Sequence, residues 1–149
     1  MRREIFADSS RLNAPDDDDT LISADHLSES LRDAKLFKEA KSLLRKYIPV
    51  ARRTRENGNE ILLDLRTSYA QAIYRDTNSS RSDVHEAVAI LEDVVRTARR
   101  VFGAEHPYFA TYRQDLESAR MRLADDESRA ALAAPAPPTR RRRHRRRPK

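Results

Sequence analysis

The chain has 149 residues, of which 38% are hydrophobic and 36% are charged, with two glycines and neither tryptophan nor cysteine. This composition fits one domain with a thin core and a large surface, as in a helical solenoid. It excludes disulfides and thiolate metal sites, and it argues against β-rich and glycine-loop nucleotide-binding folds. No apolar run approaches the roughly 18–20 residues of a membrane span, and Met1-Arg2-Arg3 is not followed by the apolar segment of a secretory signal.

The net charge of +6 is distributed unevenly along the chain. Residues 140–149 hold eight Arg and Lys side chains, so the chain before them has a net charge of about −2 (+6 less 8). The basic character therefore belongs to the C-terminal tail, and the predicted folded body is nearly neutral.

An acidic N-terminal segment, residues 1–19, precedes the first apolar pattern. It contains little to bury, so we expect it to be flexible. Its run Asp16–Asp19 lacks the spaced ligands and the glycine of a calcium loop, which favours a solvated linker. The carboxylates, with Thr20 as a candidate N-cap, would also favour the start of the first helix through its dipole.

A first pair of helices is predicted over Thr20–Asp33 and Leu36–Glu56, because apolar residues recur there every three or four positions. The inward positions are Leu21, Ala24, Leu27 and Leu31, then Leu36, Ala40, Leu43, Leu44, Tyr47, Ile48 and Ala51. Pro49 removes a backbone donor and clashes with the preceding turn, so we expect a kink or break near Lys46–Ile48. The sequence Asn57-Gly58-Asn59 should end the second helix.

A second pair begins with a helix over Glu60–Arg75 and continues, after the polar loop Thr77–Ser82, with a long helix from Asp83 to Phe102. Asp83 is the expected N-cap of this long helix, with Glu86 as its capping-box partner. The inward positions are Leu62, Leu65, Tyr69, Ala72 and Ile73, then Val84, Ala87, Val88, Leu91, Val94, Val95, Ala98, Val101 and Phe102.

A last helix follows a short turn. Gly103 should end the long helix, and Pro107 suits the first turn of the next one. Its inward residues are Phe109, Tyr112, Leu116, Ala119 and Leu123, and it should continue through residues 124–134 until the prolines that begin at Pro135. Helices joined by so few residues lie nearly antiparallel, and each covers the apolar face of its neighbour.

The helical pairs repeat. Shifting the sequence by 47 positions places Glu39-Ala40 on Glu86-Ala87 and Ala51-Arg52-Arg53 on Ala98-Arg99-Arg100, and the apolar positions of both helices coincide. The fold class predicted from this is an all-α helical-repeat solenoid of about five antiparallel helices, or two and a half units. The expected organisation is a flexible acidic segment over 1–19, a repeat domain over 20–128 and a disordered Pro/Arg-rich basic tail over 129–149.

These pairs resemble the tetratricopeptide repeat, in which a small residue opens the second helix of each unit, as Ala40 and Ala87 do here. Ala98–Gly103 followed by Glu105-His106-Pro107 is similar to the long repeat of kinesin light chains. The resemblance spans about residues 20–125. The sequence does not contain the heptad coiled coil by which kinesin light chains bind their motor subunit. The resemblance therefore implies a repeat fold and an interaction role rather than membership of a motor complex.

The resemblance also implies where a partner would bind. Tetratricopeptide modules bind peptides on the concave face lined by the first helix of each unit. Carried over by position, the binding residues would be Asp25, Glu29, Arg32, Ser68, Arg75, Glu117 and Met121. A surface with both arginines and carboxylates could bind a short extended or helical peptide by charge-assisted hydrogen bonds. The alternative is that these side chains are only solvated. Exposed apolar edges of the terminal helices would favour self-association.

No enzymatic activity and no cofactor are expected. His106 could be imagined as a base, but its position before Pro107 favours a helix cap. His85-Glu86 begins a zinc-protease pattern that fails at Ala89, and the histidines have no spacing suited to a metal.

The basic tail supports an alternative function. Its charged residues are Arg140, Arg141, Arg142, Arg143, Arg145, Arg146, Arg147 and Lys149. They could bind nucleic acid without sequence specificity or direct nuclear import, although no aromatic residue is present for base stacking. The tail could also contact an acidic membrane surface or have no function at all. The expected localisation is cytoplasmic, or nuclear if the tail is an import signal.

Overall fold

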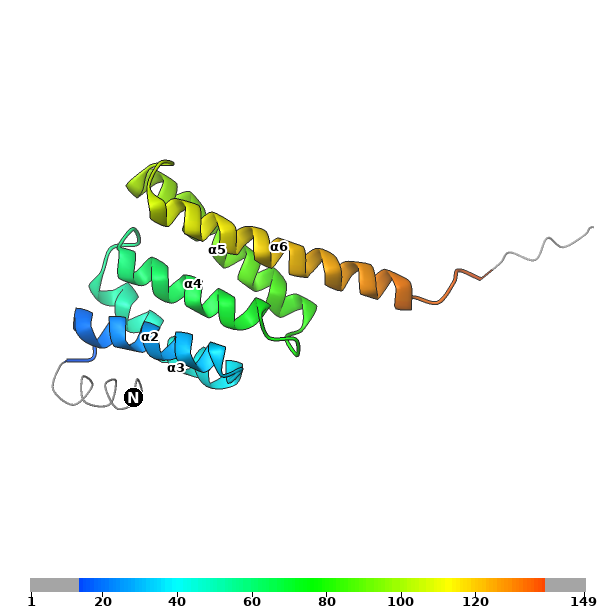
Figure 1. Ribbon diagram of the computed structural model, residues 1–149, viewed down its shortest axis with the longest axis horizontal. Coiled ribbons are helices and arrows are strands. Elements are labelled where there is room, and N and C mark those ends of the chain that lie inside the picture. Colours follow the sequence, from blue (N-terminus) through cyan, green and yellow to red (C-terminus); the bar gives the residue numbers. More distant parts are fainter. Residues whose placement is uncertain (1–13, 139–149) are drawn as a thin grey trace, which may run out of the picture.

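The computed structural model describes residues 14–138, which form five α-helices (Figure 1). They are α2 (Asp18–Asp33), α3 (Phe37–Thr54), α4 (Glu60–Tyr74), α5 (Arg81–Phe102) and α6 (Pro107–Ala133). Each helix packs against the one before it in the antiparallel manner that short connections impose. The all-α repeat architecture predicted from the sequence is confirmed.

The helices are arranged in two layers. The central helix α4 contacts α2 and α6 as well as its sequence neighbours α3 and α5, whereas α3 and α5 do not contact each other. Accordingly α2, α4 and α6 line one face of the body, here called the A face, and α3 and α5 form the opposite B face (Figure 1).

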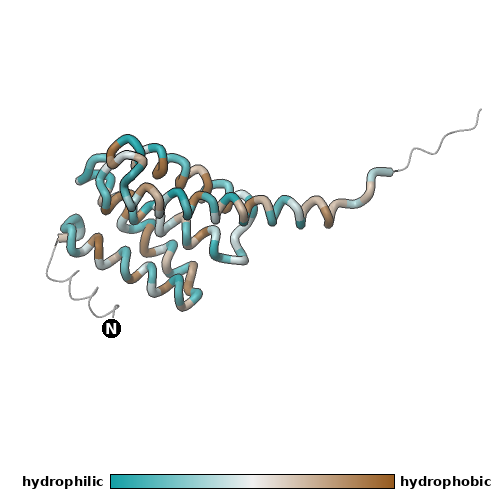
Figure 2. Tube along the Cα trace, turned by 45° about the horizontal axis from the view of Figure 1, so that its top comes forward, coloured by the Kyte–Doolittle hydropathy of each residue, from teal (hydrophilic) through white to brown (hydrophobic). Residues whose placement is uncertain are grey.

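The core follows the predicted apolar faces, and hydrophobic and hydrophilic residues alternate along every helix (Figure 2). Leu21, Leu44, Leu62, Leu65 and Leu91 are at most 1% exposed. Two predicted core positions are wrong: Leu36 is 39% exposed and Val101 is 49% exposed. Leu36 lies in the N-cap position of α3, and Val101 lies in the last turn of α5, where no helix covers it fully.

Helix α3 runs through Pro49 without interruption, so of the predicted kink or break, the break is wrong. Pro49 is exposed, while Leu44, Tyr47, Ile48 and Ala51 on either side of it are buried. Burial of this face stabilises the helix by more than the one missing hydrogen bond destabilises it.

The N-terminal caps differ from the prediction at two helices. Asp17, not Thr20, occupies the N-cap position of α2, and Thr20 is buried inside the helix. The N-cap of α5 lies three residues earlier than predicted: it is Ser80, and Asp83 is the capping-box partner. The expected acidic first turn of α2 is present as Asp18 and Asp19.

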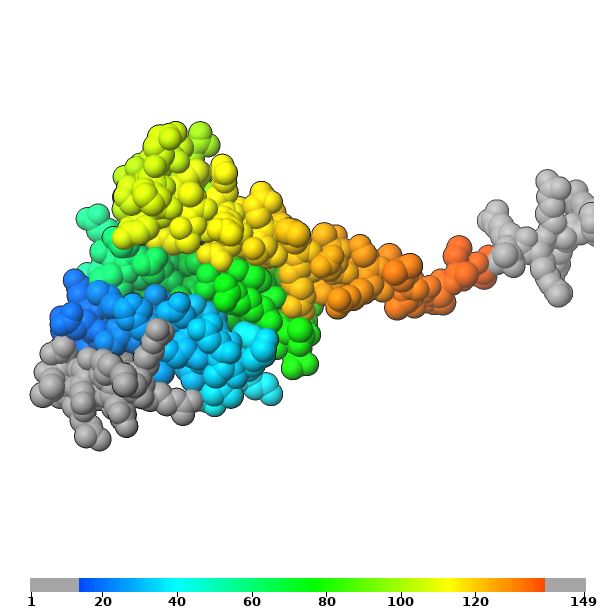
Figure 3. All heavy atoms as spheres, viewed as in Figure 1, coloured from blue at the N-terminus to red at the C-terminus, as the bar shows by residue number. Residues whose placement is uncertain are grey.

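The turn between α5 and α6 forms as predicted. Gly103 has a φ of 87°, which favours glycine, and Pro107 occupies the first turn of α6. His106 caps α6, since its Nδ1 accepts a hydrogen bond from the backbone N–H of Tyr108 at 3.3 Å. Beyond Leu123 the end of α6 projects from the body, as the space-filling view shows (Figure 3).

Candidate functional site: the A face

The A face carries both carboxylates and arginines. The carboxylates are Asp25, Glu29, Glu60 and Asp64, and the arginines are Arg32, Arg75 and Arg122. On α4 the two signs are separated, because Glu60 and Asp64 lie in its first two turns and Arg75 follows its last turn. A partner lying along α4 would therefore meet opposite charges at the two ends of this helix.

Three of the predicted binding residues form one network between α2 and α4. The Ser68 hydroxyl donates to Oδ1 of Asp25, and Nη1 of Arg32 donates to Oγ of Ser28 at 3.0 Å and to the carbonyl of Ser68 at 3.5 Å. Arg32 and Ser68 are 7% and 6% exposed. These two side chains therefore join the helices and offer a partner little surface.

Burial changes the ionisation of this network. Burial raises the pKa of Asp25, while the hydrogen bond from Ser68 and the charge of Arg32 oppose the rise. Burial likewise lowers the pKa of the Arg32 guanidinium, and the nearby charge of Arg75 adds to this. The charges of Asp25, Glu29 and Asp33 act in the opposite direction and raise the pKa of Arg32.

Asp64 is one of the A-face carboxylates that the sequence did not predict as site residues. Its Oδ1 accepts a hydrogen bond of 2.6 Å from the Tyr112 hydroxyl of α6. Burial raises the pKa of Asp64 to about 6, with smaller contributions from the charges of Asp25 and Glu60. Among the described residues no cation forms an ion pair with Asp64, so this corner of the A face attracts positive charge.

A second carboxylate joins α4 to α6. Oδ1 of Asp115 accepts hydrogen bonds from Nε2 of Gln71 at 2.8 Å and from the Tyr74 hydroxyl at 2.9 Å. Nearby, Nη1 of Arg122 donates to the carbonyls of Tyr74 and Asp76, at 2.9 and 3.1 Å. The Tyr74 carbonyl belongs to the last residue of α4, and the Asp76 carbonyl, just beyond the helix, also accepts from the N–H of Ser79 at 3.1 Å. Arg122 therefore joins α6 to the end of α4 and to the turn that follows it.

The remaining predicted binding residues do not come together. Glu29 and Arg75 are exposed on the A face. Glu117 lies beside Ala110, Arg113 and Gln114. With Met121, which is 68% exposed, it lies on the side of α6 that faces away from α4 and α5. A single ligand on the A face would therefore contact Glu29 and Arg75 but not this pair.

A signal for the missed residues was present in the repeat spacing. Asp64 and Tyr112 are 48 positions apart, and Gln71 and Asp115 are 44 apart, both close to the repeat length. Residues one repeat apart lie on equivalent helices of adjacent units, here α4 and α6. A carboxylate and a hydrogen-bond donor at that spacing are therefore candidates for contact.

Comparison with known proteins supports the repeat assignment. Residues 77–108 match the model of a family described as tetratricopeptide repeat. The match covers α5 and the turn that leads into α6. No curated protein and no solved structure matches the chain.

Two further findings bear on the predicted partners. Within residues 14–138, no helix combines the length and the apolar character that crossing a membrane requires. The basic tail, residues 140–149, lies outside the described part of the chain.

Proposed function

We propose that this protein is a non-catalytic interaction module that binds an extended or helical segment of a partner protein on its A face. The tetratricopeptide match supports a protein-binding role in general terms. The observation that carries the proposal is Asp64, a half-buried carboxylate without a cationic partner among the described residues, set on the same face as the exposed Arg75.

The charges of the A face favour a particular kind of partner segment. A Lys or Arg side chain of the segment would pair with Asp64 and Glu60, and a carboxylate would pair with Arg75. Such a segment would lie along α4, with its direction set by Asp64 near the start of the helix and Arg75 just after its end. The shallow face of three helices suits a modest affinity.

We also propose that the repeats are of the kinesin light chain-like type. The sequence Ala98-Arg99-Arg100-Val101-Phe102-Gly103 and the turn with His106 and Pro107 support this subtype. In the structure α5 ends at Phe102, and Gly103 follows with a positive φ. His106 is the N-cap of α6, and Pro107 is the first residue of that helix.

Affinity capture with charge-reversed variants tests the A face. The full chain, Arg75→Glu and Arg113→Glu would each be incubated with nuclease-treated lysate, and captured proteins would be identified by mass spectrometry. Arg113 is the matched control, because it is exposed on the side of α6 away from the A face. We expect Arg75→Glu to lose proteins that both the native chain and Arg113→Glu retain.

Two results would contradict the proposal. One is that both variants capture the same proteins as the native chain. The other is that a chain ending at Pro138 captures nothing, or that capture occurs only from lysate not treated with nuclease, which would favour a nucleic-acid-associated role for the basic tail.

A further inference from the structure

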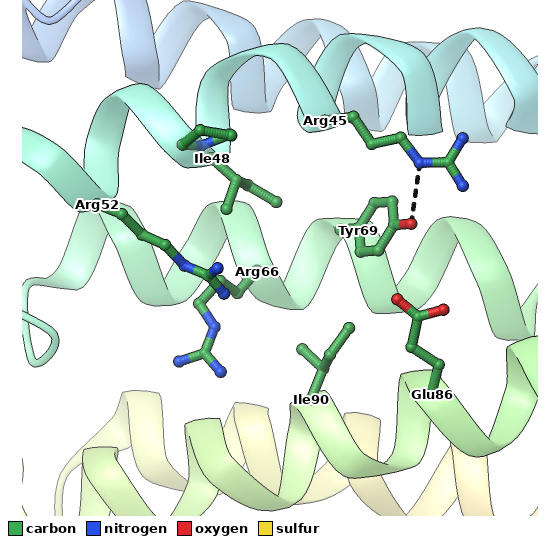
Figure 4. A pocket seen from close by; sticks show the side chains of 8 residues that line it. Arg45, Ile48, Arg52, Arg66, Tyr69, Glu86 and Ile90 are labelled. Atoms are coloured by element: carbon green, nitrogen blue, oxygen red, sulfur yellow. Dashed lines mark hydrogen bonds between the residues drawn. The ribbon is translucent and has the colours of Figure 1, made fainter.

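The B face contains a groove that the proposed A-face site does not use. It lies between α3 and α5, which do not contact each other, and its floor is formed by α4 (Figure 4). The hollow has a volume of about 280 Å³. This is room for one or two side chains of a bound segment, not for a nucleic-acid duplex.

One end of the groove is basic. Arg52 of α3 points toward Arg66 of α4 (Figure 4). Arg66 donates from Nη2 to Asp93 at 2.7 Å, while its Nε is buried and has no hydrogen-bond partner. Arg52 forms no ion pair within the described residues. The buried Nε of Arg66 is closed to a partner, so the anion-binding end of the groove is the Arg52 guanidinium with the outer nitrogens of Arg66 beside it, which together can donate to both oxygens of a carboxylate.

The middle of the groove is apolar. Ile48 and Ile90 extend into it from opposite walls (Figure 4). Tyr69 lies on the floor, on the side of these isoleucines that is away from Arg52 and Arg66. The Tyr69 ring is fixed by Arg45, whose guanidinium carbon lies 5.6 Å from the ring centre and whose Nε donates to the hydroxyl at 3.1 Å. A large apolar side chain entering here would lose contact with water on both sides.

We propose that this groove binds an extended segment of a partner protein in which a Glu or Asp lies next to a large apolar residue. The carboxylate binds between Arg52 and Arg66, and the apolar side chain packs between Ile48 and Ile90. Arg45, Arg52 and Arg66 line the groove with one carboxylate, Glu86, and Asp93 pairs with Arg66, so the remaining positive charge favours an acidic partner segment. A nucleic acid fits less well, because Glu86 would repel phosphates at one end and the apolar centre would remain unfilled.

Peptide selection tests the groove with the full chain and needs no named partner. A random peptide library would be panned against the full chain, and enriched peptides would be synthesised and titrated by fluorescence anisotropy. The variants are Arg52→Glu, Arg52→Lys and the matched control Arg53→Glu. Arg53 is the exposed neighbour that does not line the groove. Arg75→Glu separates this site from the A face, and circular dichroism verifies the fold of every variant.

We expect enriched peptides that combine acidic and large apolar residues. Arg52→Glu should weaken their binding at least about tenfold, whereas Arg53→Glu and Arg75→Glu should change it less than about twofold. Arg52→Lys should lie between, because it keeps the charge but not the paired donors. Three results would overturn the proposal: no acidic–apolar peptide is enriched, Arg52→Glu leaves the affinities unchanged, or the affinities depend on Arg75 instead.

An oligonucleotide titration is the remaining arm of the test. A single-stranded oligonucleotide without secondary structure would be added to the full chain, to a chain lacking residues 140–149 and to Arg52→Glu. Binding that survives removal of residues 140–149 and is lost in Arg52→Glu would assign the groove to nucleic acid and overturn the peptide proposal.

Discussion

At the scale of single residues, Asp64 makes stability depend on pH. Its pKa in the folded protein is about 6, against 3.8 for an exposed carboxyl, so the folded state keeps a proton that the unfolded chain has lost. The stabilising contribution is complete below about pH 3.8 and is lost as the pH rises through 6. Asp64→Asn keeps an acceptor for Tyr112 but cannot titrate.

Urea unfolding of the native chain and Asp64→Asn across this range measures the effect. We expect the free energy of unfolding of the native chain, relative to the variant, to fall as the pH rises from about 4 to about 6. Other titrating groups are common to both chains, and to first order their effects cancel in the difference. A difference that stays constant over this range would contradict the raised pKa.

Gly58 is required by close packing against Val101. A Cβ at Gly58 would lie 2.6 Å from Cγ2 of Val101, closer than packed carbon atoms approach. We expect Gly58→Ala to destabilise the protein by about 1 kcal/mol. In the Val101→Ala background the same change should become neutral or stabilising by up to about 1 kcal/mol, because alanine restricts the unfolded chain. Thermal unfolding of the four variants provides this comparison, and equal costs in both backgrounds would show that packing is not the cause.

At the scale of a helix, Ser80 determines where α5 begins. Its hydroxyl accepts from the N–H of Asp83 at 3.1 Å, and the Asp83 carboxylate accepts from the N–H of Ser80 at 2.9 Å. Ser80→Ala should therefore cost about 1 kcal/mol in the free energy of unfolding. Ser82→Ala, two residues into the helix and exposed, is the control and should change stability by less than about 0.5 kcal/mol. If the two changes cost the same, the cap lies elsewhere.

Pro49 destabilises α3 while leaving it continuous. Pro49→Ala would restore a donor to the carbonyl of Arg45 and remove a steric conflict, so we expect stabilisation of about 1–3 kcal/mol in urea unfolding. The side chain is exposed, so no core contact is lost. A destabilised variant would show that the proline ring contributes packing that its exposure does not suggest.

The helices could be predicted from the sequence because the spacing of apolar residues is a property of each segment by itself. The turn at Gly103 and Pro107 could be predicted because each of these residues has a strong conformational preference. The start of α5 could not be predicted, since Ser80 and Asp83 are both good N-caps and the apolar pattern of the helix begins after both of them. The continuity of α3 depends on burial against α2 and α4, which outweighs the preference of Pro49. At the A face the spacing predicted which side of each helix is exposed. The spacing could not predict that Arg32 forms hydrogen bonds between helices instead of facing a partner, because such contacts depend on how side chains extend across the interface.

At the scale of the whole molecule, stability should decrease from the centre of the repeat array toward its C-terminal end. Helix α4 contacts all four other described helices, whereas the end of α6 beyond Leu123 projects from the body. In a solenoid each unit is stabilised by its neighbours, so opening begins where neighbours are few. We expect amide hydrogen exchange to be slowest in α4, and fastest, among the described helices, in residues 124–133.

Arg122 tests whether this gradient is carried by contacts between units. It donates to the carbonyls of Tyr74 and Asp76 and pairs with Asp126 at 3.0 Å, so it connects the end of α4 to α6. Arg122→Ala should speed exchange in α6 and in the last turn of α4 while leaving α2 and α3 nearly unchanged. Arg129→Ala, in the projecting end, is the matched control and should alter neither. Uniform acceleration along the chain would instead mean that the described helices open as one cooperative unit, and then a partner bound at either face would stabilise every helix equally.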